Sequence, residues 1–166
     1  MTYFRPEFHS LRRPHPILWT PGSNPHEVAK AVIQLKMLSG RYQTGVLTSY
    51  WDSKGGCCPA PDCTEPETLE HILVFCPYYE QTRLKLKRLW NSSTHTDVHQ
   101  LASLALSGPP LDLVQFILDP SVHPSVISLT QVYGSEPLLL IFYLTRTWCF
   151  SVHRERAKLQ GRFKFN

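Results

Sequence analysis

Four of the five cysteines in this 166-residue chain lie between residues 57 and 76, together with one histidine. Thiolate sulfur and imidazole nitrogen are ligands of tetrahedral zinc, which they bind at about 2.3 Å and about 2.0–2.1 Å. The spacing C-x4-C-x7-H-x4-C supplies four such ligands: Cys58, Cys63, His71 and Cys76. Cys57 could replace Cys58 as the first ligand, and the shorter loop to Cys63 favours Cys58. We therefore expect one bound Zn²⁺ ion.

The residues between these ligands can bring them to one side. Residues 58–63 contain two prolines and an aspartate, which are typical of a tight turn. Thr64 and Glu67 form a capping-box pattern, which predicts a helix that carries His71 and ends at Cys76. Four protein ligands close the coordination shell, so we expect a structural site and no catalytic one. The alternative is that the cysteines are ordinary buried residues and the histidine lies on the surface.

The apolar spacing elsewhere predicts a mostly α-helical chain, with the small zinc-stabilised CCHC segment embedded in a helical domain. Asn24 can cap a helix that ends at Gly40, along which apolar residues repeat at helical spacing: Val28, Val32, Leu35 and Leu38. Strand signals are weak throughout. Further helices are expected over residues 77–90, 98–106, 111–118, 122–132 and 137–160.

Composition and charge limit the class of protein. A hydrophobic content of 42% supports a core, and the net charge of +4 favours anionic partners without proving one. The apolar stretch 137–152 is interrupted by Arg146, so we interpret it as a buried helix and expect no membrane span. Clustered cysteines without a visible signal peptide indicate a reducing compartment, which predicts an intracellular protein, nuclear or cytoplasmic.

Three regions are expected along the chain. Residues 1–23 contain prolines that interrupt any helical period, and they are predicted to form an irregular N-terminal arm. Residues 24–92 form the zinc-binding region, and residues 93–166 form a helical C-terminal region with a basic tail.

Basic residues gather at two places, where they could neutralise phosphates of a nucleic acid. The alternative is that these cations form solvated helix faces or favour the negative end of a helix dipole. Tyr78, Tyr79 and Trp90 could stack on bases, although Tyr79 and Trp90 could instead turn to the core. One cluster follows the cysteines and the other lies in the tail: Arg83, Lys85, Lys87 and Arg88; and Arg146, Arg154, Arg156, Lys158, Arg162 and Lys164.

Residues 28–90 resemble the zinc-binding region near the C-terminus of non-LTR (LINE-type) retrotransposon reverse transcriptases. In that family a helix and a Thr-Gly turn precede a cysteine pair, which an E-T-x-x-H-x-x-x-x-C-P motif and an arginine follow. Residues 142–163 also look like the closing segment of some of these elements. The first cysteine pair departs from the family, because four residues separate it where about two are usual. The matching positions are Arg41, Thr44, Gly45, Cys58, Cys63, Glu67, Thr68, His71, Cys76, Pro77 and Arg83.

The resemblance implies a zinc-binding segment that accompanies a polymerase and helps to hold RNA or DNA. The chain has no carboxylate pair of the polymerase type and no nuclease pattern, so we expect no enzyme activity of its own. The leading hypothesis is therefore a sequence-nonspecific nucleic-acid-binding module that uses phosphate contacts. A structural zinc-containing module that binds another protein, such as a polymerase polypeptide, is the alternative, and a decayed element fragment is a third reading.

Overall fold

The chain folds into helices that pack around one long central helix, α8. The computed structural model describes residues 14–49, 55–92 and 96–161, and within these segments it contains no β-strand. The prediction of a mostly α-helical fold is confirmed. The helices are α1 (Pro16–Trp19), α2 (Pro25–Leu38), α3 (Gly45–Thr48), the π-helix η2 (His71–Phe75), the 3-10 helix η3 (Pro77–Tyr79), α4 (Glu80–Asn91), α5 (Thr96–Ser107), α6 (Pro110–Leu118), the 3-10 helix η4 (Pro120–Val122), α7 (Pro124–Tyr133) and α8 (Glu136–Leu159).

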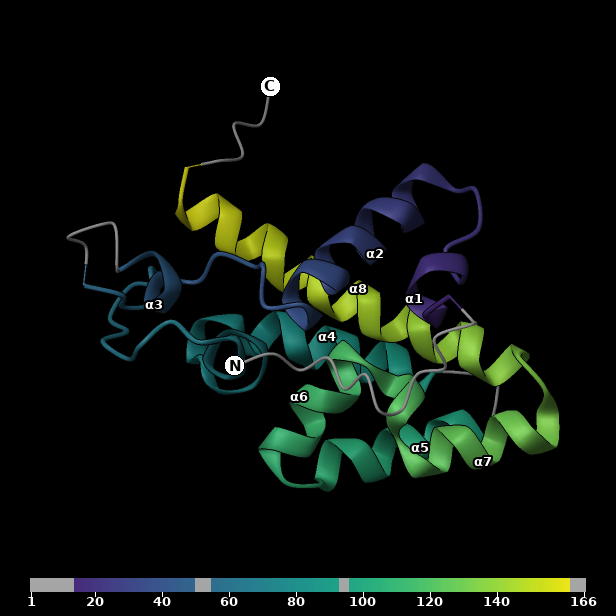
Figure 1. The fold of residues 1–166 in the computed structure, drawn as a ribbon. Coiled ribbons are helices and arrows are strands. Elements are labelled where there is room, and N and C mark those ends of the chain that lie inside the picture. Colours follow the sequence, from purple (N-terminus) through teal and green to yellow (C-terminus); the bar gives the residue numbers. More distant parts are fainter. Residues whose placement is uncertain (1–13, 50–54, 93–95, 162–166) are drawn as a thin grey trace.

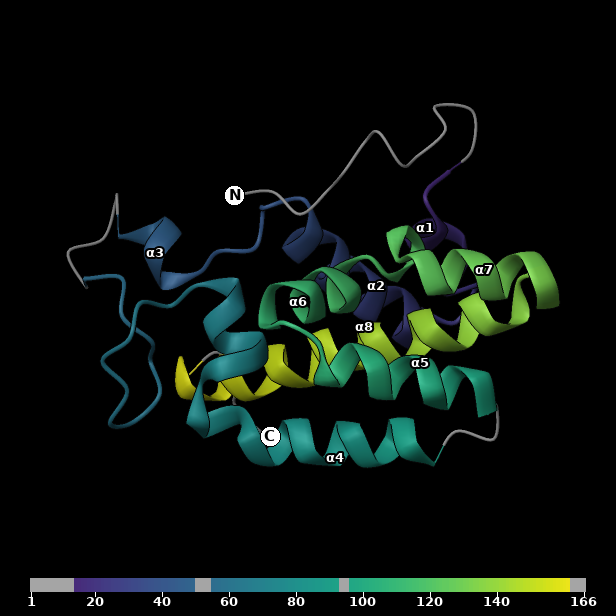
Figure 2. The same ribbon diagram turned by 90° about the horizontal axis from the view of Figure 1, so that it is seen from below.

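Helix α8 contacts α2, α4, α5, α6 and α7, so every long helix of the described chain packs against it. Figure 1 shows α8 running diagonally between α2 and the α5–α7 group, and Figure 2 shows α4 along one outer edge. The indole rings of Trp90 in α4 and Trp148 in α8 lie 5.3 Å apart at the centre of the core. One hydrophobic cluster thus joins the predicted regions 24–92 and 93–166.

Residues 137–152 lie within α8, where they pack against the other helices as expected. Among the helices of the described segments, none has both the length and the apolar character that crossing a bilayer requires. Of the predicted N-terminal arm, residues 1–13 lie outside the described residues, and Pro16–Trp19 form the short helix α1.

Helix α2 buries a different side from its most apolar one. Asn24 caps the helix as predicted, because its side chain accepts a hydrogen bond from the backbone N–H of His26 at 3.0 Å. Of the four residues that set the helical period in the sequence, Leu38 is buried as expected, but Val28, Val32 and Leu35 are 40%, 44% and 36% exposed. The side of α2 that packs on the protein consists of Lys30, Ala31, Gln34, Met37 and Leu38.

Polar partners from distant helices explain why α2 turns this side inward. The Gln34 amide donates to the Ile117 carbonyl at 2.8 Å and to the Thr145 hydroxyl at 3.1 Å. Glu27 accepts from both Lys30 and Arg146 at 2.7 Å. Buried polar groups are tolerated when they are paired in this way, which hydrophobic periodicity does not register.

A buried ion pair joins the cysteine-containing segment to α8. The Arg156 guanidinium donates to the Glu67 carboxylate at 2.6 Å and 2.8 Å and to the Gln43 carbonyl at 2.8 Å. Glu67 also accepts a hydrogen bond from the Gly45 N–H, at the start of α3. Burial opposes the charge of Arg156, but the Glu67 carboxylate raises the pKa of Arg156 overall. Both side chains are almost fully buried, so each charge depends on the other.

This ion pair gives a prediction for stability. Substitution Glu67→Gln leaves the Arg156 charge buried without its counterion, which typically costs about 3–5 kcal/mol. The free energy of unfolding, measured in urea, should fall by that amount. Glu155→Gln is the matched control, because Glu155 pairs with Lys158 at the surface and such pairs contribute less than about 1 kcal/mol. Equal effects of the two substitutions would contradict the assignment.

Candidate metal centre

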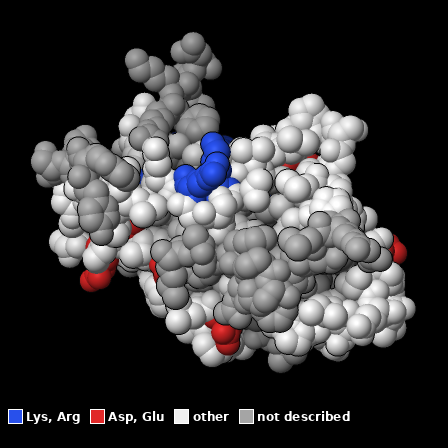
Figure 3. All heavy atoms as spheres, in the orientation of Figure 1, with Lys and Arg blue, Asp and Glu red and all other residues white. Residues whose placement is uncertain are grey.

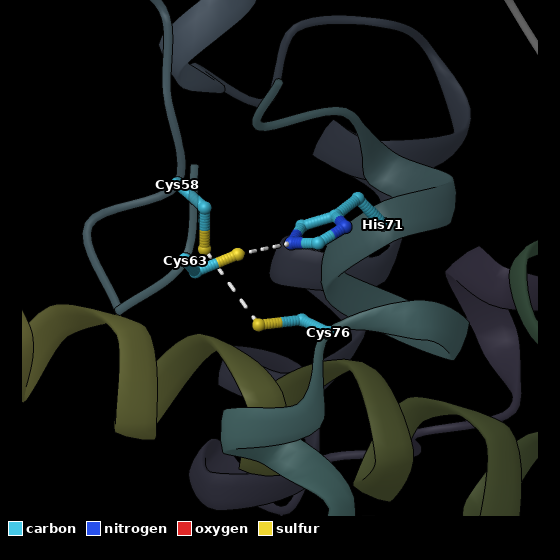
Figure 4. Close-up of side chains that lie close together, drawn as sticks. All are labelled: Cys58, Cys63, His71 and Cys76. Carbon is cyan, nitrogen blue, oxygen red and sulfur yellow. Dashed lines mark hydrogen bonds between the residues drawn. The ribbon is translucent and has the colours of Figure 1, made fainter. Parts of the chain in front are cut away.

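Cys58 and Cys63 lie on a short hairpin. Backbone hydrogen bonds within the hairpin determine the direction in which their side chains point. The Cys58 N–H donates to the Glu65 carbonyl at 2.9 Å, and the Glu67 N–H donates to the Gly56 carbonyl at 2.9 Å. At the tip, the Cys63 N–H donates to the Ala60 carbonyl at 3.2 Å. The turn predicted for residues 58–63 is therefore present, and it directs Cys58 and Cys63 toward the same point (Figure 4).

The other two ligands lie at the two ends of a π-helical turn, η2. Its closing hydrogen bond runs from the Cys76 N–H to the His71 carbonyl at 2.7 Å, five residues back. Residues five apart in an α-helix point about 140° away from each other, because each residue turns the helix by about 100°. The wider π-turn brings the two side chains closer in direction, and such turns are frequent at functional sites.

The capping-box prediction for this segment is wrong. Glu67 does not reach back to Thr64, because its carboxylate binds Arg156 and the Gly45 N–H. Thr68 takes the capping role instead, since its hydroxyl accepts a hydrogen bond from the His71 N–H at 3.1 Å. The helical turn consequently begins later than the sequence pattern indicates.

The four side chains converge on one point (Figure 4). The Cys58 and Cys76 sulfurs lie 3.7 Å apart, the Cys63 sulfur lies 3.2 Å from Nε2 of His71, and all four ligand atoms lie within 4.8 Å of one another. Two sulfurs that bind one tetrahedral ion at about 2.3 Å are about 3.8 Å apart, whereas a disulfide bond is about 2.05 Å long. The cluster can therefore hold one metal ion, and its cysteines are free thiols.

The structure distinguishes the two adjacent cysteines. Cys58 is buried with the other ligands, whereas Cys57 is exposed, and its sulfur lies 3.7 Å from the Gly55 carbonyl oxygen. Successive residues on an extended backbone point to opposite sides, so one of the pair must face away from the cluster. Cys58 is the member that the hairpin directs inward.

Burial controls the protonation of the ligands. It raises the pKa of the Cys58 thiol to about 12 and also raises the pKa of Cys76, because a thiolate is poorly solvated there. The same burial lowers the pKa of His71, which keeps the imidazole neutral and able to bind a metal. A metal ion must therefore displace protons from these thiols when it binds.

The basic residues that follow the site have different environments. In α4, Lys85 and Arg88 are exposed, Lys87 is partly exposed and Arg83 is half-buried. Tyr79 and Trp90 point into the core, whereas Tyr78 is exposed. The cations that remain accessible on α4 are therefore Lys85, Lys87 and Arg88.

The tail cluster is mostly not a free basic surface. The expectation that Arg156 contacts phosphates is wrong, because Arg156 is 5% exposed and its guanidinium binds Glu67. Lys158 pairs with Glu155 at 2.7 Å, and Arg154 is exposed. Arg162 and Lys164 lie outside the described residues.

Two further interactions at the site have no local sequence signal. The Trp148 indole N–H donates to the Leu73 carbonyl at 3.3 Å, which ties η2 to α8. Glu67 and Arg156 are 89 residues apart in the chain, so their pairing depends on the folded arrangement.

No protein-family model, curated protein or solved structure matches this chain. The likeness of its motif to retrotransposon reverse transcriptases therefore stays a prediction.

The adjacent cysteines provide a sharp test of the ligand set. We expect Cys58→Ser to abolish or strongly weaken metal binding, because it removes one of four converging ligands. Cys57→Ser, one residue away, should leave binding unchanged at one ion per chain. Elemental analysis of the purified proteins measures the metal-to-protein ratio directly. Loss of the metal in Cys57→Ser with retention in Cys58→Ser would contradict the assignment.

The raised pKa values predict how binding depends on pH. At pH 7 the thiols of Cys58 and Cys76 are protonated when no metal is bound, so lowering the pH favours the metal-free form. The apparent affinity should fall by about tenfold per pH unit for each thiol proton that the metal displaces. Competition with a chromophoric chelator at pH 6, 7 and 8 measures this slope, and a constant affinity would contradict the model of proton displacement.

Proposed function

We propose that this chain is a zinc-stabilised nucleic-acid-binding module that has no catalytic activity of its own. Three thiolates and one imidazole form a donor set that suits Zn²⁺ in a closed structural site. In this role Cys58, Cys63, His71 and Cys76 hold the ion, and the ion fixes the segment from which α4 begins. The metal then acts by positioning a surface and takes no part in chemistry.

The observation that carries the proposal is the unpaired basic surface of α4. Lys85 and Arg88 are exposed, Lys87 is partly exposed, and no ion pair engages any of the three within the described chain. Cations that protein carboxylates do not neutralise are free to bind phosphates and release counterions. The exposed ring of Tyr78, just before α4, adds a surface on which an unpaired base could stack.

Few of the described Lys and Arg side chains lie on the face of the molecule opposite α4. Helix α4 lies behind α8 in Figure 1 and along one edge in Figure 2. On the face seen in Figure 3, Lys and Arg atoms form one small group, and most of the described surface is uncharged. Trp148 is the α8 residue that packs on Trp90 of α4, and Arg154 points about 120° away from it around α8. The proposed contact is therefore local to α4.

RNA and DNA remain equal candidates for the ligand, because phosphate contacts do not distinguish them. Sequence-nonspecific binding is expected, since cations that contact the backbone carry no base information. A second candidate function is binding of another protein, such as a polymerase polypeptide. It is favoured by the exposed apolar stripe of Val28, Val32 and Leu35 on α2.

A salt titration separates these two functions. Wild-type protein should bind single-stranded RNA and DNA, with log K falling linearly against log salt. The double variant Lys85→Gln/Arg88→Gln should bind more weakly and show a slope smaller by about 1.4, because each phosphate contact contributes about 0.7. Glutamine favours helix formation, so the fold of α4 should persist. Circular dichroism and the metal-to-protein ratio verify this.

The matched control removes the same charge elsewhere. Lys36→Gln/Arg41→Gln changes two exposed cations at and after the end of α2, and it should leave the salt slope close to that of the wild type. Equal losses in the two double variants would indicate an effect of net charge alone. Absence of binding at low ionic strength would refute the nucleic-acid proposal and leave the protein-binding candidate.

A further inference from the structure

Arg83 differs from the other cations of α4 because its guanidinium is partly inside the protein. Its Nη1 atom has almost no accessible surface and no hydrogen-bond partner within the described chain. Burial lowers the pKa of Arg83, since water no longer solvates the cation fully. A buried guanidinium without a partner is unfavourable unless a negative charge lies nearby.

Two negative groups act on Arg83: first Cys76 of the metal site, and then the Glu80 carboxylate, three residues earlier on α4. Arg83 follows Cys76 by seven residues and lies on the inner side of α4 with Leu86 and Trp90. Charge on Cys76 acts to raise the pKa of Arg83, and the Arg83 cation in turn acts to lower the pKa of His71. Only η3 separates Cys76 from the first turn of α4, where Arg83 lies, and this short connection keeps the buried Nη1 atom near the metal site.

The charge of the donor set favours a nearby cation. A divalent ion bound by three thiolates and a neutral imidazole has one net negative charge. The carboxylates of Glu65 and Glu67 also act on His71, so they add to the negative potential. Arg156 neutralises Glu67 through the buried ion pair, which leaves the charge of the metal centre itself without a counterion from α8.

We infer that Arg83 is a positioning residue of the metal centre, whose guanidinium balances the net negative charge of the metal bound by Cys58, Cys63, His71 and Cys76. This inference rests on the proposed metal binding. The cations of α4 then have two roles. Arg83, on the inner side, balances the charge of the metal centre, whereas Lys85 and Arg88, on the outer side, bind phosphates.

The test compares charge with shape at position 83. Arg83→Met keeps a long helix-favouring side chain but removes the charge, whereas Arg83→Lys keeps the charge and changes the shape. Loss of a residue that supports metal ligands typically weakens metal binding by about 10–100-fold. We expect this loss in Arg83→Met and a loss of less than about threefold in Arg83→Lys. Zn²⁺ affinity is measured by competition with a chromophoric chelator.

Lys36→Met, which removes an exposed cation from α2, is the matched control, and it should keep the wild-type Zn²⁺ affinity. Arg83→Lys should also keep the wild-type salt slope for single-stranded RNA, because Arg83 makes no phosphate contact in this assignment. Circular dichroism of the zinc-loaded variants verifies folding. If Arg83→Met does not fold, Arg83→Gln replaces it as the uncharged variant.

Two results would overturn the inference. Wild-type Zn²⁺ affinity in the uncharged variant would show that the charge is unnecessary, and equal losses in Arg83→Lys and Arg83→Met would show that only the shape matters. Failure of the wild type itself to bind Zn²⁺ is a different outcome, which would refute the metal proposal as well. The two failures are therefore distinguishable in one set of titrations.

Discussion

The Glu67 carboxylate connects the metal-binding hairpin, the short helix α3 and the central helix α8. It accepts two hydrogen bonds from Arg156 and one from the Gly45 N–H, and both charged side chains are almost fully buried. A buried charge tolerates little displacement from its partner, because solvent does not replace a lost contact. The ion pair therefore fixes where the hairpin meets α8. The indole of Trp148 supports the same junction by binding the backbone of η2.

Charge in this protein is divided between internal and external roles. Arg146 and Arg156 point inward and pair with the carboxylates of Glu27 and Glu67. Lys85 and Arg88 point outward and have no carboxylate partner among the described residues. A positive net charge consequently says little about the binding surface until each cation has been placed. In our proposal, the guanidinium of Arg83 is partly buried and balances the negative charge of the metal centre.

The geometry of the ligand cluster depends on backbone hydrogen bonds more than on helix propensity. The hairpin presents Cys58 and Cys63 from one side, and the π-turn presents His71 and Cys76 from the other. Backbone hydrogen bonds stabilise both elements, and Trp148 and Arg156 of α8 contact them. Much of the site's shape therefore comes from the protein fold. A preorganised set of ligands favours metal binding, because less conformational entropy is lost when the ion binds.

The sequence alone predicted the helical class, most helix positions and the four residues that converge, because these depend on local spacing, turn residues and the chemistry of Cys and His. It did not predict which side of α2 is buried, since Gln34 and Lys30 are accommodated by partners on α6 and α8. Nor did it separate Arg156 from the exposed cations, because Glu67 lies 89 residues away. Such pairings join residues that only the tertiary structure brings together, and they decide which charges are left for a partner.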